Sequence, residues 1–395
     1  MTATTPTAKK RVLFVDDEPE ILNALANLLY RDRARWDMVF AVGGARALAE
    51  MRTKPFDVVV SDMRMPGMDG AELLDAVRAE FPGTVRIILS GHAERESILR
   101  ALPIMHQYLR KPCEPGILRT AIARCLDIAG RPSGDVRALI GRLDKLPAPR
   151  TVYFELERLI KSPSTTLDDL ARCVERDPAI AAKLLQLANS AAFGAARTVT
   201  TIADAISYLG LELIGHLVML SSLFDHPTQR GPVARLLEDL HDQTLRTAAL
   251  VRRLIPERKP AELAFAAALF HDVGEAVLMV GMPETYPALL AATAASHEPL
   301  VVAERRELGA SHAEVGAYLL GMWGLPAPLL DLVAYHHDPR GAPAELHPVL
   351  AALHVADALT TSWRDPNEAM IDHAFLTEIG AADKLATWRT IAEQP

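Results

Sequence analysis

Four short runs of apolar residues lie in the first part of the chain, and a polar residue follows each one. The runs are Val12–Val15, Val58–Val60, Ile87–Leu89 and Tyr108–Leu109. Each is continuous rather than alternating, which is typical of strands buried on both faces of a sheet. Between the first two runs, apolar residues recur at helical spacing, at Ile21, Leu22, Leu25, Leu28 and Leu29. Strands that alternate with helices predict a doubly wound, parallel α/β sheet.

The pattern changes after a short linker at residues 129–135, which combines Gly, Pro and Ser. Beyond it, apolar residues recur at helical spacing and no β-rich run follows, so residues 136–395 are predicted to be all-α. The α/β domain then spans residues 11–128. The Thr-rich residues 1–10 are predicted to be disordered.

Local signals mark helix ends in the second half. Thr166 and Asp169 are placed as a capping pair. Asp177 stands directly before a proline, the order found where helices begin. Gly210 is placed to end another helix.

The polar residues that follow the four strands suit phosphoryl chemistry. The carboxyl ends of parallel strands meet at one edge of a sheet, where ligands bind. Asp16 and Asp17 follow the first strand, Asp62 the second, Ser90 the third and Lys111 the fourth. We therefore predict that Asp62 accepts a phosphoryl group as an acyl phosphate and that the three carboxylates bind Mg²⁺. Lys111 and Ser90 would contact the phosphoryl oxygens.

This arrangement resembles the receiver domain of bacterial two-component response regulators, from about Arg11 to Asp127. The resemblance implies a flavodoxin-like fold with Asp62 as phosphoacceptor. Asp17 and Asp62 would bind Mg²⁺ directly, Asp16 would act through water, and the backbone carbonyl of Arg64 would add a ligand. It further implies that Ser90 and Tyr108 switch on phosphorylation, that Lys111 senses the phosphate, and that the Lys111–Pro112 bond is cis.

Composition narrows the range of partners. The net charge is −8 and there is no basic block, which argues against a DNA-binding output. The three cysteines show no CxxC spacing, as expected of free thiols in a reducing compartment. We find neither a signal peptide nor an uninterrupted apolar stretch of the roughly 18 residues that a membrane helix needs. A cytoplasmic protein without membrane contact is expected.

The second half resembles the HDOD family, a helical output domain related to HD phosphohydrolases, from about Leu139 to Leu359. The front part matches mainly in packing and turn residues, such as Asp177–Pro178, Phe193–Gly194 and Leu209–Gly210. Asn189 is the polar exception, and its expected task is to tie a loop to a helix end. An HD-like subregion at about 232–360 has the side chains that bind metal in HD enzymes, namely His241, His271, Asp272, His312, His336, His337 and Asp357.

The sequence leaves metal binding and catalysis in this subregion open. Imidazoles and carboxylates suit Fe, Mn or Zn, which could activate water against a phosphodiester. Three departures from the related enzymes argue against catalysis. Glu275 replaces a lysine and would repel an anionic substrate, no GYP segment follows His337, and Leu237 replaces a glutamate. His336 and His337 would point about 100° apart on a helix, so both can bind metal only with two metals or where the helix ends.

The main hypothesis is therefore a response regulator. A sensor histidine kinase or phosphotransfer protein would phosphorylate Asp62, and the HDOD domain would respond by binding an unidentified downstream protein. A homodimer is a further option. The alternative is a metal-dependent phosphohydrolase or phosphodiesterase gated by the receiver, and a weaker idea is a domain that binds a cyclic dinucleotide without cleaving it.

Overall fold

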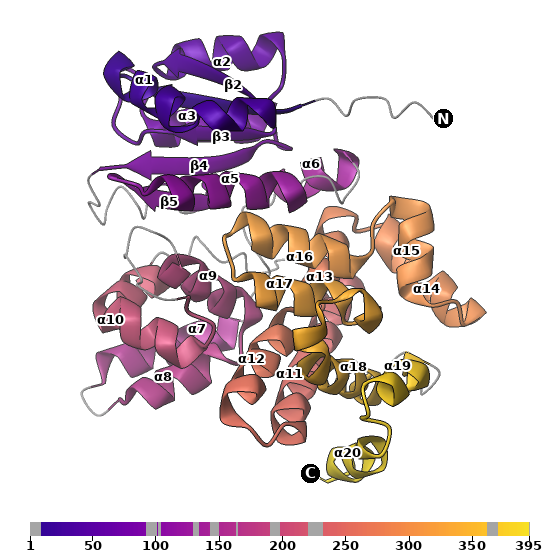
Figure 1. Ribbon diagram of the computed structural model, residues 1–395. Coiled ribbons are helices and arrows are strands. Elements are labelled where there is room, and N and C mark those ends of the chain that lie inside the picture. The colour runs from indigo at the N-terminus through magenta and orange to yellow at the C-terminus, as the bar shows by residue number, and fades with distance from the viewer. Residues whose placement is uncertain are drawn as a thin grey trace, which may run out of the picture. The chain divides into compact units, whose positions relative to one another are not determined.

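The computed structural model describes residues 9–91, 101, 104–128, 134–142, 150–162, 165–189, 198–219, 232–361 and 370–394. These residues form two compact units, shown in Figure 1. One unit holds a parallel sheet with its helices, and the other is helical. Most of the expected disordered segment 1–10 and most of the expected linker 129–135 lie outside the described residues.

The sheet of the first unit has five parallel strands in the order β2-β1-β3-β4-β5. Their bounds are β1 (Lys10–Asp16), β2 (Trp36–Val42), β3 (Val58–Ser61), β4 (Val85–Ser90) and β5 (Gln107–Arg110). The three central strands are buried along nearly their whole length, as continuous apolar runs require. The predicted doubly wound fold is confirmed.

Helices cover both faces of this sheet. The described helices are α1 (Pro19–Leu28), the short 3₁₀ helix η1 (Tyr30–Ala34), α2 (Gly44–Thr53), α3 (Gly70–Glu80) and α5 (Pro115–Ile128). The connection from β1 to β2 runs in the opposite direction across the sheet from the connections β2 to β3 and β3 to β4. Right-handed crossovers therefore place α1 on one face, and α2 and α3 on the other. Arg119 of α5 donates hydrogen bonds to Asp32 of η1 and to the carbonyl of Leu28, so α5 lies beside α1.

Helix α6 (Gly134–Arg142) follows, and residues 137–142 group with the sheet rather than with the helical unit. The buried Arg86 guanidinium of β4 donates a hydrogen bond to the carbonyl of Gly141, 3.1 Å away. A Cβ atom at Gly141 would lie 1.6 Å from the carbonyl oxygen of Pro82. Only a glycine allows this close approach.

The second unit is built from helices alone in its described part. Its first helices are α7 (Arg150–Lys161), α8 (Leu167–Val174), α9 (Pro178–Asn189), α10 (Ile202–Met219) and α11 (Pro232–Leu254). They are followed by α12 (Arg258–Phe270), α13 (Val273–Gly281), α14 (Thr285–Ser296), α15 (Leu300–Leu308), α16 (His312–Met322) and α17 (Ala327–Tyr335). Two 3₁₀ turns, η3 (Pro339–Gly341) and η4 (Ala344–Leu346), lead to α18 (His347–Thr360), α19 (His373–Glu378) and α20 (Lys384–Ala392).

One stretch of the described chain, Arg258–Gly281, is long and apolar enough to cross a membrane by length and composition. It comprises α12 and α13, and 83% of its apolar window is buried inside the unit. Helices in the core of a domain pass the same test, because they can be apolar on all sides when other helices cover their surface.

The local signals predicted for the second half are confirmed. Thr166 and Asp169 form a reciprocal capping box. The Asp177 carboxylate accepts hydrogen bonds from two backbone N–H groups at the start of α9. Asn189 bonds to the carbonyl of Leu185 and to both backbone groups of Val199, tying a loop to the end of α9. At Gly210 the backbone leaves helical geometry (φ 77°) and breaks α10.

Candidate functional site

The carboxyl edge of the sheet brings together three of the residues predicted for phosphoryl chemistry. Asp16 ends β1, Asp62 directly follows β3, and Lys111 directly follows β5. The Lys111 ammonium lies 2.6 Å from a carboxylate oxygen of Asp16 and 2.6 Å from one of Asp62. Burial disfavours the charged ammonium, but these two hydrogen bonds outweigh it and raise the pKa of Lys111. The lysine is therefore charged and offsets part of the local negative charge.

The backbone around Asp62 fixes the direction of its carboxylate. Its second oxygen accepts a hydrogen bond of 2.6 Å from the backbone N–H of Arg64. Helix α3 begins directly against this loop, since a Cβ atom at Gly70 would lie 2.2 Å from the carbonyl oxygen of Asp62. Glycine at the first position of α3 thus allows the helix to approach the loop.

The other predicted residues of this edge lie where parallel pairing puts them. Ser90 ends β4 and is buried, and its carbonyl accepts a hydrogen bond from the backbone N–H of Lys111. The Lys111–Pro112 bond is cis, as the resemblance implied. Tyr108 is buried, and burial raises the pKa of its phenol. Asp17 is half-buried at the end of β1.

The donor set at this edge fits Mg²⁺. Asp16, Asp17 and Asp62 offer only carboxylate oxygens, the hard ligands that this ion prefers. Asp16 is buried and Asp62 is held by a backbone hydrogen bond, so both carboxylates are positioned in advance. The ammonium of Lys111 is the cation that pairs with Asp16 and Asp62 among the described residues.

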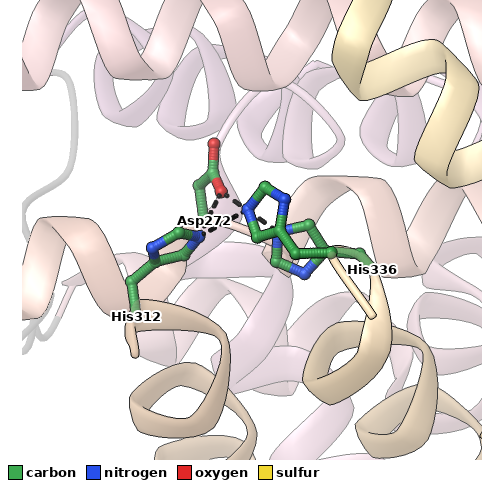
Figure 2. A group of neighbouring side chains, drawn as sticks. Asp272, His312 and His336 are labelled. Carbon is green, nitrogen blue, oxygen red and sulfur yellow. Dashed lines mark hydrogen bonds and ion pairs between the residues drawn. The ribbon is translucent and has the colours of Figure 1, made fainter. Parts of the chain in front are cut away.

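A second cluster of titratable side chains lies inside the helical unit, at the ends of several helices. His271 follows α12, and Asp272 directly precedes α13. His312 is the first residue of α16, and His336 directly follows α17. Figure 2 shows Asp272, His312 and His336 pointing toward one another. Because α17 ends at Tyr335, His337 can also face the cluster, which meets one of the two conditions stated above.

The first part of the cluster, here called the His-rich group, consists of Asp272, His312, His336 and His337. One oxygen of Asp272 lies 3.5 Å from Nε2 of His312 and 3.6 Å from Nε2 of His336. The Nε2 atoms of His312 and His337 are 3.0 Å apart. Two nitrogen lone pairs at this distance repel each other, so a proton or a metal ion must lie between them.

The imidazoles are oriented by hydrogen bonds on their other nitrogens. Nδ1 of His271 contacts the carbonyl of Ala268, and Nδ1 of His336 contacts that of Val333. A carbonyl only accepts, so in both rings Nδ1 donates and the Nε2 of the neutral ring offers a lone pair. Both side chains are 0% exposed, and Nε2 of His336 has no hydrogen-bond partner in the described residues, whereas Nε2 of His271 faces two carboxylates. A buried polar atom without a partner is costly, and a metal ion would satisfy Nε2 of His336.

The second part, here called the Asp357 group, consists of His271, Asp272 and Asp357. Nε2 of His271 lies 3.0 Å from one oxygen of Asp272 and 3.4 Å from one of Asp357. Burial alone would lower the pKa of His271, but the two carboxylates raise it well above its usual value. Burial alone would raise the pKa of Asp272, but the neighbouring His271 holds it well below its usual range.

His241 belongs to neither group among the described residues. It is half-buried on α11, and burial is the main cause that lowers its pKa. The residue of α11 that reaches the cluster is Gln243, whose amide lies 3.5 Å from Asp357 and 3.2 Å from Thr361. The two side chains are two positions apart and so leave the helix in nearly opposite directions. Six of the seven predicted metal-site residues therefore come together, and His241 does not.

Two carboxylates and a phenol around the cluster were not assigned from the sequence as partners of its histidines. Glu304 of α15 is fully buried and bonds to both Nδ1 and the backbone N–H of His312. The Tyr286 hydroxyl donates to Glu304. Glu275 is also buried, 3.9 Å from Nδ1 of His312, so it lies on the outer side of that ring. Glu304 could not be found from spacing, since it reaches the cluster from a separate helix.

The neighbouring side chains determine the charge states of His312 and His337 in the His-rich group. Burial alone would lower the pKa of His312, but Glu304 overrides it and raises the pKa to about 9. Burial and the neighbouring His336 and His312 hold the pKa of His337 well below its usual value. His337 is thus a neutral ligand, and its side chain, 14% exposed, is the most accessible of the group.

Each half of the chain matches a known protein family. The response regulator receiver domain family matches residues 12–123, and the HDOD domain family matches residues 146–339. An uncharacterized protein of Treponema pallidum is 26% identical over 61% of this chain and 47% of its own length. The hydrogenase transcriptional regulatory protein HoxA of Cupriavidus necator is 31% identical over 42% of this chain and 36% of its own length. The chain thus spans less than half the length of these two curated relatives.

Among solved structures, a virulence factor from Campylobacter jejuni is similar in fold. It has a TM-score of 0.53 and 22% identity, and the match covers 65% of this chain and 96% of that one. With the sheet order, the cis Lys111–Pro112 bond and the helical second unit, these matches show that the chain joins a response regulator receiver domain to an HDOD domain.

Proposed function

We propose that this protein is a response regulator in which phosphorylation of Asp62 controls a protein-binding HDOD domain. The observation that carries the proposal is the meeting of Asp16, Asp62 and Lys111 at one edge of the sheet, with 2.6 Å between the ammonium and each carboxylate. Receiver domains in general take phosphate from a histidine kinase or a phosphotransfer protein and bind Mg²⁺. We infer the same donor and the same ion here, in a cytoplasmic protein.

In the proposed reaction, a carboxylate oxygen of Asp62 attacks the phosphorus of the donor. A P–O bond to Asp62 forms as the P–N bond to the kinase histidine breaks, and that imidazole leaves with the electron pair. Mg²⁺, held by Asp16, Asp17 and Asp62, would offset the negative charge of the phosphoryl group. Lys111 already contacts Asp62 and would shift its hydrogen bond to a phosphoryl oxygen.

The phosphorylation test uses the full chain with Mg²⁺ and acetyl phosphate. Intact-mass measurement is expected to show one added phosphoryl group on wild type and none on Asp62→Asn. Asp75→Asn is the matched control, because Asp75 is an exposed acid on α3 that forms an ion pair with Arg78 on the same helix. A wild-type chain that stays unmodified, or an Asp62→Asn chain that is still modified, would refute the phosphoacceptor assignment.

The output test compares the beryllofluoride-loaded chain with Asp62→Asn by hydrogen exchange. We expect loading to change amide protection in the HDOD domain. Phosphorylation can act as a signal only if the added charge shifts a structural element between two conformations. Unchanged protection throughout residues 150–361 would remove the coupling, while leaving phosphorylation itself intact. Pull-downs with both forms would then identify the downstream partner.

We also propose that the His-rich group binds one of the transition metals Fe, Mn or Zn, because it combines imidazoles and a carboxylate with an unpartnered Nε2 atom on His336. This observation keeps a metal-dependent phosphohydrolase as the second candidate function. The burial of His271, His312 and His336 favours ion binding over turnover, since catalytic sites keep a position open to substrate. Elemental analysis of the purified chain, together with phosphodiester hydrolysis by wild type and His336→Ala, separates the two.

A further inference from the structure

We infer that the HDOD domain binds a single transition-metal ion in the His-rich group, and that Glu304 is the positioning residue that makes His312 a ligand. This inference rests on the proposed metal binding in the pocket and adds which atoms bind, how many ions are bound and which neighbour controls the affinity. The proposed ion lies in the His-rich group and not in the Asp357 group.

The His-rich group presents a complete set of four ligand atoms from four residues. These are an oxygen of Asp272 and the Nε2 atoms of His312, His336 and His337, and one choice of ligand atoms from all four lies within 4.8 Å of one another. Three imidazoles and one carboxylate satisfy a tetrahedral Zn²⁺ or a similar ion. His337 is the most exposed of the four ligands, with 14% of its side chain accessible.

Within the part of the chain that the structure describes, the Asp357 group has three ligand-type side chains and no fourth. It offers one imidazole and two carboxylates, and one of these, Asp272, is shared with the His-rich group. The side chain that α11 contributes beside Asp357 is Gln243, with its amide N–H₂ directed at the carboxylate. An amide nitrogen donates a hydrogen bond and is no metal ligand, so this group is held together by hydrogen bonds instead.

Glu304 orients His312 from behind. Its carboxylate contacts Nδ1 of His312 at 2.8 Å and the backbone N–H of the same residue at 2.9 Å. The hydroxyl of Tyr286 holds the other oxygen of Glu304. A carboxylate that accepts the Nδ1 proton directs the Nε2 lone pair toward the metal and makes the imidazole a stronger ligand.

The stoichiometry test measures Zn²⁺ binding to the full chain in excess Mg²⁺, which occupies the oxygen ligands of the receiver. We expect one Zn²⁺ per chain in wild type. His336→Ala should lose it, while Asp357→Asn and His241→Ala should keep it. Two zinc ions per chain, or loss in Asp357→Asn equal to that in His336→Ala, would overturn the assignment to the His-rich group.

The positioning role is tested with Glu304→Gln and Tyr286→Phe. Glu304→Gln should weaken zinc binding by about 10–100-fold, because a neutral amide oxygen accepts the Nδ1 proton of His312 more weakly than a carboxylate does, and the ¹⁵N chemical shift of Nδ1 should report this weaker hydrogen bond. Tyr286→Phe removes a neighbour of Glu304 but leaves the contact to His312, so it should retain most of the affinity. Zinc binding by Glu304→Gln as tight as in wild type would overturn the role of Glu304.

If Glu304→Gln does not fold, the set of ligands is tested instead on the cobalt-substituted wild-type chain. Its absorption bands should report three nitrogens and one oxygen in tetrahedral geometry, and oxygen-rich octahedral bands would contradict the inference. A wild-type chain that binds no zinc or cobalt would instead refute the proposed metal binding itself. Phosphorylation of Asp62 is independent of all these outcomes.

Discussion

At the scale of single residues, Asp177 is a helix-capping carboxyl group whose ionisation is opposed by burial. Its side chain is fully buried, and one oxygen accepts hydrogen bonds from the N–H groups of Ala179 and Ile180. The other oxygen has no partner among the described residues. Burial therefore dominates and raises the pKa of Asp177 from its usual 3.8 to about 7.

The raised pKa of Asp177 predicts a pH-dependent stability of the HDOD domain. Between about pH 4 and pH 7 the native state holds this proton more tightly than the unfolded chain. The free energy of unfolding should therefore fall as pH rises through this range. Asp177→Asn cannot ionise, so its stability relative to wild type should increase between pH 4 and pH 8. Urea unfolding followed by circular dichroism at both pH values measures the difference.

Asp169 on the neighbouring α8 is the control of opposite sign. Hydrogen bonds from Thr166 lower the pKa of this exposed carboxylate. Its contribution is fully present above its ordinary pKa of 3.8 and is lost only as pH falls below that value, so the stability of Asp169→Asn relative to wild type should change little between pH 4 and pH 8. The same pH trend in both variants would contradict the buried-charge explanation for Asp177.

At the scale of secondary-structure elements, the His-rich group depends on the close packing of α13 against α16 at two glycines. Gly274 in the first turn of α13 faces Gly316 of α16. A Cβ atom at Gly274 would lie 1.9 Å from the carbonyl oxygen of His312 and 2.8 Å from the backbone nitrogen of Gly316. This close contact brings the start of α16, with His312, beside Asp272.

Gly274→Ala should therefore push α13 and α16 apart. The added methyl group meets backbone atoms, which cannot move aside as a flexible side chain does, so the HDOD domain should lose about 1–3 kcal/mol or more of stability. Zinc binding should weaken as His312 moves away from Asp272. Gly116→Ala on α5 is the matched control, because a Cβ atom there meets nothing within 4 Å. It should be neutral or stabilise by up to about 1 kcal/mol, and equal effects of the two variants would contradict this account.

At the scale of the whole molecule, the chain combines two compact units with different ligand chemistries. The carboxyl edge of the sheet offers carboxylates and an ammonium group. The helical unit offers imidazoles in a buried cluster. Hard oxygen ligands select Mg²⁺, whereas imidazoles select transition metals, so the two units should respond to different ligands.

Calorimetry of the full chain should show this separation. Zn²⁺ at 100 times its dissociation constant should stabilise the helical unit by about 2.7 kcal/mol and leave the receiver transition unchanged. Mg²⁺ with beryllofluoride should stabilise the receiver. His336→Ala should abolish only the zinc response and Asp62→Asn only the beryllofluoride response. A zinc response that disappears in Asp62→Asn would place the zinc in the receiver instead.

The parallel α/β class, four of the five strands with their ends, and the helix caps could be read from the sequence alone, whereas β2 (Trp36–Val42) and the order of the strands could not. Continuous apolar runs specify buried parallel strands, and parallel pairing then places Asp16, Asp62 and Lys111 at one edge. The capping box at Thr166 and the loop tie at Asn189 involve groups within ten residues of each other. Such features are local or follow from strand direction, so their physical cause is present in the sequence pattern.

Only the tertiary structure decided which side chains form the buried cluster of the HDOD domain. The sequence indicated His241, but the face of α11 that meets α18 presents Gln243. Glu304 reaches His312 from a separate helix, and Glu275 lies on the outer side of that ring, 3.9 Å from its Nδ1. Periodicity specifies which face of a helix is apolar, but the rotation and crossing of packed helices depend on the fit of side chains from distant segments.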